Sequence, residues 1–351
     1  MKKRIVFDCE RMKYSNTGIY HYCLNLGQHL LEQADPEMEQ LNFYAPRHVN
    51  SFGTQNNYLA QHSLHKFLLP PLGKYDIWHA TYQNTDYIPQ RNRKLKVLLT
   101  IHDLNFIYDD LKSEYKKQKY LRHLQKNIDR SDAIVCISEF CRNDVMKYCD
   151  TGNKPVHIIH NGTNALSSPT LEETSYKPVK RFVFSIGVIT RKKNFHALLP
   201  LLLNNDMELL IAGRHDDPCY LNYLINMARD LGVEENVKIL GNISEHEKSW
   251  YFRNCYAFAS TSMAEGFCLP VTEAMSVGKP LFLSQQTALP EIGGKVAFYF
   301  SDFNGTNMQN VFFNGMDQYK STNMHQQIRE RGLSFSWKKT AERYVEIYRS
   351  L

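Results

Sequence analysis

The segment from Ser260 to Met275 places two glutamates, a glycine and a proline where they could hold a phosphorylated ligand. Glu265 and Glu273 stand eight residues apart, and a carboxylate can accept two hydrogen bonds from a vicinal diol. Pro270 suits the first turn of a helix, so the backbone amides of residues 267–271 would lie at the positive end of the helix dipole and could bind a diphosphate. The alternative is structural: Glu273 only favours the helix N-terminus, and Glu265 is solvated.

Several other kinds of site find no support in the sequence. There is no Walker-type phosphate loop, and no Gly-x-Gly-x-x-Gly follows an expected strand. Ser138 lacks the flanking glycines of a hydrolase nucleophile. The eight cysteines include no Cys-x-x-Cys pair, so we predict no zinc site and expect reduced, buried, cytoplasmic thiols. Because no Asp-x-Asp is present to clamp a metal-bound diphosphate, we also predict an activity that needs no metal.

Expected strands and helices alternate along the chain, which is typical of α/β proteins. The expected strands are Arg4–Phe7, Leu41–Tyr44, Asp76–Ala80, Val97–Ile101, Ala133–Ile137, Val156–Ile159, Arg181–Ile186, Glu208–Ala212, Val237–Leu240, Cys255–Ser260 and Pro280–Leu283. A basic helix is expected at Leu111–Asp129, and Ser138 is expected to cap the next one. The alternation predicts two doubly wound, parallel-sheet domains, with a ligand in the cleft between them.

Length and composition agree with two globular domains. The 351 residues suggest about two domains, and the polar, proline-containing stretch 166–180 is expected to link residues 1–165 to residues 181–337. The net charge of +6 suits an anionic small molecule or membrane surface and is too weak to indicate nucleic acid. No apolar stretch approaches the length of a transmembrane helix, and acidic residues near the N-terminus argue against a signal peptide.

The run Glu-Gly-Phe-Cys-Leu-Pro-Val-Thr-Glu-Ala from Glu265 resembles the donor-site signature of retaining glycosyltransferases of the GT-B fold, family 4 (glycosyl transferases group 1). Other segments resemble the family's remaining motifs in the expected order, so the resemblance covers essentially the whole chain. These segments are Thr17-Gly18-Ile19, Thr100–Leu104, Ile134–Phe140, Ile158–Gly162, Ser185–Gly187 with Lys192–Asn194, and Phe335–Trp337. The resemblance implies a GT-B fold whose first domain binds the acceptor and whose second binds a nucleotide sugar, with residues 338–351 returning to the first domain.

The resemblance also implies a role for each matching residue. Glu273 would bind the nucleotide ribose, and Glu265 the hydroxyls of the transferred sugar. Lys193, with Lys192 or Arg191, would stabilise the leaving diphosphate. The remaining donor-site positions are Gly18 and Gly187, where backbone would approach the diphosphate, Ile243 beside the base, and Gly266, Phe267, Cys268 and Leu269 of the signature loop.

His102 would lie near the reaction centre and, with Glu265 and Lys193, makes up the expected catalytic set. The alternative for His102 is a purely structural hydrogen bond, and Asp103 is expected to hold its loop. The family often has Gly at the position of Cys268, and often Arg where Lys192 stands. The second difference would replace a bidentate phosphate contact by a point charge.

The activity implied is transfer of a hexose, with retention of configuration, from a nucleotide diphosphate sugar to a glycan or lipid-linked acceptor of surface polysaccharide assembly. GDP-mannose is the favoured donor, and no cofactor is expected. The basic stretch Lys112–Lys126 is interpreted as a peripheral contact with an anionic membrane, at the inner face of the cytoplasmic membrane, or else as a solvated helix face. Two other classes stay open: another GT-B enzyme such as a nucleotide-sugar epimerase, and a non-catalytic nucleotide-sugar-binding module.

Overall fold

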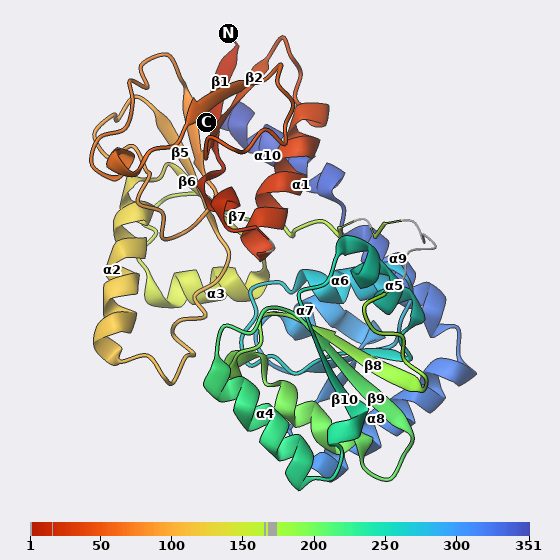
Figure 1. Cartoon of the computed structure of the whole chain (residues 1–351). Coiled ribbons are helices and arrows are strands. Elements are labelled where there is room, and N and C mark those ends of the chain that lie inside the picture. Colours follow the sequence, from red (N-terminus) through yellow and green to blue (C-terminus); the bar gives the residue numbers. More distant parts are fainter. Residues whose placement is uncertain (1, 16, 165, 168–173) are drawn as a thin grey trace. The chain divides into compact units, whose positions relative to one another are not determined.

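The computed structural model describes residues 2–15, 17–164, 166–167 and 174–351, which form two compact units (Figure 1). The first unit comprises Met1–Gly162 and Phe335–Leu351, and the second comprises Thr163–Ser334. The first unit thus ends three residues before the expected boundary at 165, and the C-terminal segment joins it from Phe335 instead of residue 338.

Part of the expected linker 166–180 lies outside the described residues, namely residues 168–173. The described remainder packs on the second unit. Ser249 Oγ donates a hydrogen bond to the Ser167 carbonyl at 2.7 Å, and the Ser175 amide donates to Glu247 at 2.8 Å. These contacts attach both described ends of the segment to one helix of the second unit, α5 (Glu245–Asn254).

The first unit contains a seven-stranded, wholly parallel sheet in the order β3-β2-β1-β4-β5-β6-β7. Its strands are β1 (Lys3–Asp8), β2 (Glu39–Ala45), β3 (Asn57–Ala60), β4 (Ile77–Ala80), β5 (Lys96–Ile101), β6 (Ala133–Cys136) and β7 (Val156–Ile158). The edge strand β3 was missing from the sequence expectation, because it has only four residues and none of them is fully buried. A short, half-exposed edge strand carries little of the apolar pattern by which strands are recognised.

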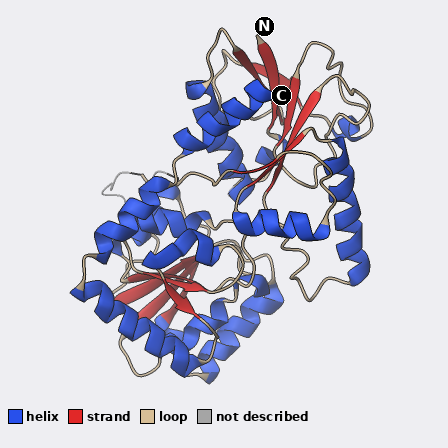
Figure 2. Ribbon diagram, turned by 180° about the vertical axis from the view of Figure 1, so that it is seen from behind, coloured by secondary structure: helices blue, strands red, loops and turns tan. Residues whose placement is uncertain are grey.

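The helices of the first unit lie on both faces of its sheet (Figure 2). They are α1 (Gly18–Gln33), α2 (Glu114–Arg130), α3 (Glu139–Tyr148) and α10 (Trp337–Ser350). Ser138 caps α3 as predicted, with its Oγ accepting from the Cys141 amide at 3.1 Å. The basic helix α2 begins at Glu114 and not at Leu111, because Ser113 is its N-cap and Asp109 holds the Leu111 amide in a preceding turn.

A buried polar network ties the C-terminal helix α10 to the sheet of the first unit. The His79 ring bonds both the Thr100 hydroxyl at 2.8 Å and the Tyr348 hydroxyl at 2.7 Å. Tyr344 contacts Thr100 at 3.0 Å and Tyr22 of α1 at 2.8 Å. Burial lowers the pKa of His79 to about 3, so the ring is neutral and can both donate and accept.

The second unit contains a six-stranded parallel sheet in the order β10-β9-β8-β11-β12-β13. Its strands are β8 (Arg181–Ile186), β9 (Met207–Ala212), β10 (Val237–Gly241), β11 (Ala257–Ser260), β12 (Leu281–Ser284) and β13 (Phe298–Phe300). Its α-helices are α4 (Pro218–Asp230), α5, α6 (Leu269–Ser276), α7 (Leu289–Gly293), α8 (Gly305–Ser321) and α9 (Met324–Ser334). The expected fold of two doubly wound, Rossmann-like parallel sheets is confirmed.

The cysteines are free, as expected, but not all of them are buried. Cys9, Cys23, Cys136, Cys141 and Cys255 are buried. Cys149 and Cys268 are partly exposed, and Cys219 is exposed at the start of α4. The expectation of buried thiols was wrong for these three, because they lie at helix ends and not in strands: Cys149 follows α3, Cys219 is in the first turn of α4, and Cys268 precedes α6.

Candidate functional site

A lysine–glutamate pair occupies the carboxyl edge of the second unit's sheet. Strands β8 and β11 are neighbours, and their connections leave on opposite sides, which makes this the point where ligands bind in doubly wound sheets. Lys193 follows β8 and Glu265 follows β11, and Lys193 Nζ donates to Glu265 Oε1. The sequence prediction named both residues, and the structure brings them together.

Two hydrogen bonds join the loops that carry this pair. The Met263 amide donates to the Lys192 carbonyl at 2.9 Å, and Thr261 Oγ1 donates to the Asn194 carbonyl at 2.8 Å. Asn194 adopts a left-handed conformation with φ 56°, which ends the 3₁₀ turn Arg191–Lys193. The basic turn is therefore fixed against the glutamate loop by backbone contacts that do not involve its side chains.

The electrostatics of the pair keep Glu265 ionised. Burial by itself would raise the pKa of Glu265, but the charges of Lys193 and Lys192 outweigh it and hold that pKa below its ordinary value. Only 11% of the Glu265 side chain and 19% of the Lys193 side chain are exposed. Glu265 is not solvated as its structural alternative required, so that alternative is wrong.

Two glycines, Gly187 and Gly213, allow the Lys193 side chain and the neighbouring backbone to pack closely together. A Cβ at Gly187 would lie 3.0 Å from Lys193 Cε, so Gly187 makes space for the lysine stem. A Cβ at Gly213 would lie 2.0 Å from the Gly187 carbonyl oxygen, which no side chain tolerates. The sequence analysis missed Gly213, although its position directly after a strand was a signal, since β9 ends at Ala212.

The signature loop keeps a glycine-like backbone although it carries a cysteine. Cys268 has φ 74°, in the left-handed region, and Leu269 and Pro270 open α6 behind it. Gly266 and Phe267 are buried. The Val271 amide donates to the Cys268 carbonyl at 3.0 Å, so it is not available to an anion as predicted, and Pro270 has no amide proton to offer.

Glu273 is buried in a second charged cluster of the same unit. Its Oε1 accepts from Asn164 Nδ2 at 2.8 Å and from Lys248 Nζ at 3.1 Å. Lys248 also pairs with Glu245 at 2.7 Å; burial would lower the pKa of Lys248, but the two glutamates raise it above its ordinary value. Sequence reasoning missed Lys248 and Asn164; the only signal was Glu245-x-x-Lys248 on one helix face.

The remaining predicted positions of the second unit lie around this edge. The Arg191 guanidinium lies 5.2 Å from the centre of the Tyr223 ring, a cation–π contact. Lys192 stands between Arg191 and Lys193 and contributes to the low pKa of Glu265. Ile243 is half-buried in the turn between β10 and α5.

Gly18 and His102 belong to the first unit. Gly18 opens α1, and a Cβ there would meet no atom within 4 Å, so packing within the unit does not require glycine at this position. His102 Nε2 lies 2.8 Å from the Thr81 carbonyl, and its ring packs edge-on against Tyr22. Burial lowers the pKa of His102, so the ring is neutral and its Nε2 donates. Asp103 accepts from the Asn105 amide and holds the loop, as expected.

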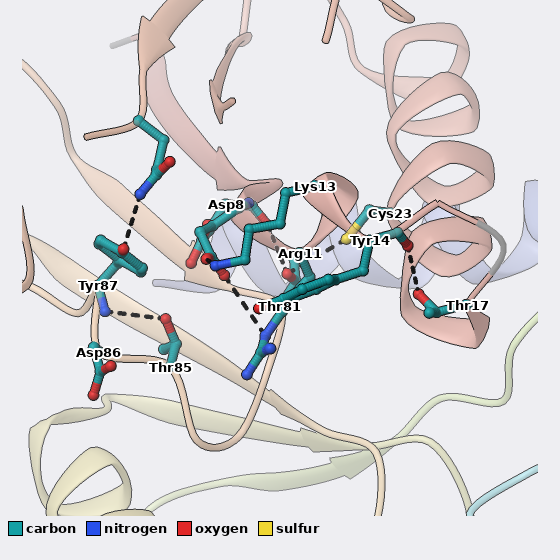
Figure 3. A network of polar contacts seen from close by, with 12 residues as sticks. Asp8, Arg11, Lys13, Tyr14, Thr17, Cys23, Thr81, Thr85, Asp86 and Tyr87 are labelled. Carbon is teal, nitrogen blue, oxygen red and sulfur yellow. Dashed lines mark hydrogen bonds and ion pairs between the residues drawn. The ribbon is translucent and has the colours of Figure 1, made fainter. Parts of the chain in front are cut away.

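The corresponding edge of the first unit carries a polar network that the sequence analysis did not identify (Figure 3). Strands β1 and β4 are neighbours here, and the residues that follow them meet. The Glu10 amide donates to Asp8 Oδ1 at 2.9 Å, and the Thr81 hydroxyl donates to the Asp8 carbonyl at 2.6 Å. Lys13 pairs with Glu10, and Arg11 lies 4.0 Å from the centre of the Tyr82 ring. Burial raises the pKa of Asp8 to about 8.

Comparison with protein families identifies both halves of the chain. A model described as glycosyl transferases group 1 matches residues 171–295, and one described as glycosyltransferase family 4 matches residues 22–165. The chain belongs to the family 4, group 1 glycosyltransferases. The resemblance stated from the signature of this glycosyltransferase is thereby confirmed.

Individual relatives of this glycosyltransferase are distant in sequence. The O-antigen chain mannosyltransferase B of Escherichia coli is 26% identical over 337 residues, covering 83% of this chain and 84% of the relative. The longer serotype-specific mannosyltransferase WbdA of Escherichia coli is 25% identical over 281 residues, which is 74% of this chain and only 34% of that protein.

Solved structures share the GT-B fold along the whole chain. Sucrose-phosphate synthase from Thermosynechococcus elongatus superposes with a TM-score of 0.79 at 16% identity, covering 99% of both chains. Anabaena HepE, solved in complex with UDP and glucose, gives a TM-score of 0.75 at 16% identity, covering 99% of this chain and 100% of that one. At such identities these likenesses establish the fold of this glycosyltransferase.

Neither a metal cluster nor a membrane-spanning helix is found among the described residues of the glycosyltransferase. No group of three or more His, Cys, Asp and Glu side chains in this part of the chain is arranged to hold a metal ion. None of the helices described is both long and apolar enough to span a bilayer.

Proposed function

We propose that this glycosyltransferase moves a mannosyl group from GDP-mannose to a glycan or lipid-linked acceptor in the assembly of a surface polysaccharide. The names of the mannosyltransferase relatives support the sugar and the pathway class, and the UDP and glucose bound to Anabaena HepE support a nucleotide sugar as donor. The Lys193–Glu265 pair is the observation that carries the proposal, because it joins a cation and a largely buried carboxylate at the edge where the sheet would bind its ligand.

In this proposal the pair separates when the donor binds. The diphosphate offers Lys193 more negative charge than one carboxylate does, so Lys193 turns to the phosphate and stabilises it as it leaves. Glu265, still ionised because Lys192 stays nearby, then accepts hydrogen bonds from the hydroxyls of the sugar. Glu273 is held by Asn164 and Lys248 through one oxygen, Oε1, and binds the ribose with the other.

We propose retention of configuration without a protein nucleophile. The acceptor attacks the face of the sugar that the diphosphate leaves, and the leaving phosphate takes the acceptor's proton. His102 serves this reaction as a neutral group near the acceptor, because its Nε2 proton is already committed to Thr81. The lysines supply the charge that a metal supplies in other transferases, so the proposed reaction needs no metal.

The proposed place of the reaction is the cytoplasm, at the inner face of the membrane, with the first unit binding the acceptor. On α2 the side chains of Lys116, Lys119, Arg122 and Lys126 are exposed, with Tyr115 exposed beside them. Lys112 and Lys117 are ion-paired, with Asp109 and Glu114, so only part of the predicted basic run presents free charge. That part would contact an anionic lipid surface.

A thermal-shift panel of GDP-mannose, UDP-glucose and dTDP- and ADP-sugars tests the donor. We expect GDP-mannose to raise the melting temperature of the wild type, and we expect Glu273→Ala to lose most of that shift because the ribose loses its acceptor. Glu235→Ala, an exposed glutamate of the same unit, is the matched control and keeps the wild-type shift. A shift with only one of the other nucleotide sugars would identify that compound as the donor in place of GDP-mannose. No shift with any nucleotide sugar of the panel would favour a non-catalytic module.

Transfer assays then separate an enzyme of this class from an epimerase. A transferase consumes GDP-mannose only when an acceptor glycan is added, whereas an epimerase converts its substrate without one. Activity measured after treatment with EDTA should equal that of the untreated protein. A loss of activity that added Mg²⁺ restores would contradict the proposed metal independence.

A further inference from the structure

The first unit contains a pocket that the proposed reaction does not use. The pocket has a volume of about 490 Å³, within the range of small-molecule sites. Its walls come from the chain between β3 and β4, from the connection between β4 and β5, and from the second half of α2. Leu72, Ile88 and Pro89 are buried in its lining and give it an apolar side, next to the buried polar residues Thr85 and Asn127.

Unusually exposed apolar side chains stand at this pocket. Phe67 is 85% exposed and its neighbour Leu68 is 71% exposed, and both line the pocket. Leu64, one turn earlier, is 63% exposed. Single exposed apolar residues are ordinary, but three large ones within five positions indicate a surface that meets an apolar partner.

The rim of the same pocket is positively charged. Lys66, Arg91 and Lys126 line it, against one carboxylate, Asp86. Asp86 lies 3.5 Å from Lys66, which neutralises that lysine. Arg91 and Lys126 are exposed and form no ion pair within the ranges that the structure describes, so two cations face solvent beside an apolar wall. A ligand complementary to both features carries an anionic group and a hydrocarbon chain.

We propose that this pocket binds a phosphate-bearing lipid, with its hydrocarbon chain along Leu72 and Ile88 and its phosphate between Arg91 and Lys126. Phe67 and Leu68 then enter the surrounding lipid, as amphipathic segments do at a bilayer surface. The phosphate and chain could belong to a membrane phospholipid or to a lipid-linked acceptor, and both present the same chemistry. This inference rests on the proposed function, because that function includes a lipid-linked acceptor bound by the first unit.

Vesicle sedimentation tests the proposal with the full chain. The wild type should bind phosphatidylcholine vesicles containing phosphatidylglycerol about tenfold more tightly than phosphatidylcholine alone, since two cations meet the anionic surface. Phe67→Ser with Leu68→Ser should weaken binding to both kinds of vesicle about tenfold. Arg91→Glu with Lys126→Glu should abolish the preference for the anionic vesicles. The matched control, Leu333→Ser with Arg329→Glu, changes similarly exposed residues of the second unit and should bind like the wild type.

A soluble prenyl phosphate distinguishes the two sources of lipid. Farnesyl phosphate should raise the melting temperature of the wild type, and inorganic phosphate should not, if the pocket takes a single lipid-linked ligand. Binding to vesicles without any effect of farnesyl phosphate would assign the pocket to bilayer phospholipid instead. Both results support the pocket, provided that the Phe67/Leu68 and Arg91/Lys126 variants lose the binding.

Three outcomes would overturn the proposal. The first is wild-type protein that binds neither vesicles nor farnesyl phosphate, and the second is pocket variants that bind as well as the wild type. The third is loss of vesicle binding only in Lys116→Glu with Lys119→Glu, which would assign the contact to the outer face of α2. The donor thermal shift is measured on every variant, so a failure of the lipid site with an intact GDP-mannose shift leaves the proposed transferase standing.

Discussion

The two sheets of this glycosyltransferase are built to one plan but carry opposite charge states at the same place. In each sheet the first strand of the unit pairs with the strand at which the strand order reverses. These pairs are β1 with β4 and β8 with β11. A buried carboxylate lies beside each junction. Two lysines keep Glu265 ionised, whereas burial keeps Asp8 protonated, with a pKa of about 8.

The difference shows that the sheet topology sets where each carboxyl group lies, whereas the neighbouring side chains set whether it is charged. Glu265 faces cations from the adjacent loop, so it stays charged at the cost of a buried pair. Asp8 has Arg11 and Glu10 close together, and their charges act on it in opposite directions. The carboxylate of the second junction is therefore ionic, whereas Asp8 of the first is held neutral by burial.

The largest expected effect comes from removing the cation of the second junction. Lys193→Ala should lower the rate of mannosyl transfer about 10²–10³-fold, because the leaving phosphate loses a pre-positioned charge. The measurement is transfer of labelled mannose from GDP-mannose to an acceptor glycan. Lys238→Ala, a cation on β10, serves as the control. A rate within twofold of the wild type would show that the Lys193–Glu265 pair is structural.

The next effect concerns the protonated carboxyl of the first junction. Asp8 keeps its proton up to about pH 8 when folded but loses it near pH 4 when unfolded, so the folded state binds more protons between these values. Stability from this group is complete below pH 4 and is lost as the pH rises, by about 1.4 kcal/mol per pH unit between pH 5 and 7. Asp8→Asn should remove that slope.

Denaturant unfolding of the wild type and of Asp8→Asn at pH 5, 6 and 7 measures this difference. The buried neutral His79 has the opposite dependence, losing stability as the pH falls below its unfolded pKa, but it is common to both proteins and cancels. Parallel curves for the two proteins would show that Asp8 is ionised in the folded state.

A smaller effect tests the cluster that holds Glu273. Lys248→Met should weaken GDP-mannose binding about tenfold and raise KM with little change in kcat, because Glu273 loses the group that orients it. The melting temperature should fall as well. Lys248→Arg should restore the KM, which recovery of packing alone would not do. An unchanged KM in Lys248→Met would make Lys248 purely a stabilising residue.

The smallest effect comes from the backbone of the signature loop. Cys268 has φ 74°, a conformation that costs a residue with a Cβ about 1–2 kcal/mol of stability. Glycine would avoid this cost, but part of the gain would be lost because glycine makes the unfolded chain more flexible. Cys268→Gly should therefore stabilise the protein by about 0.5–1 kcal/mol, or about 2 °C in melting temperature. Calorimetry of the two proteins checks this, and a lower melting temperature would show that the thiol's contacts outweigh the strain.

The parts that were predictable from sequence are those with strong local patterns. Strand β8 at Arg181–Ile186 was predicted to the residue, since its interior is an apolar run, and the cap Ser138 of α3 was predicted from its residue type and place. The edge strand β3 lacked such a pattern, and nothing was predicted for α8.

The site was predictable only where its residues share one segment or match the family signature. Glu265 and Glu273 share one segment, and Lys193 was identified through the family signature. Asn164, however, lies 109 positions from the glutamate it holds, and Lys248 lies on another helix. Contacts of that separation depend on the order of strands in the sheet, which a single sequence does not reveal.

The attachment of α10 to the first unit has a consequence for how the protein is made. Lys3 of β1 donates to the Tyr348 carbonyl of α10 at 2.9 Å, so β1 gains this contact only after α10 has been synthesised. During synthesis the whole of the second unit leaves the ribosome before α10 does, and it can fold first as a unit. Until α10 has been made, Tyr22 and His79 lack their tyrosine partners, so the buried polar network of the first unit is completed only after the second unit has been synthesised.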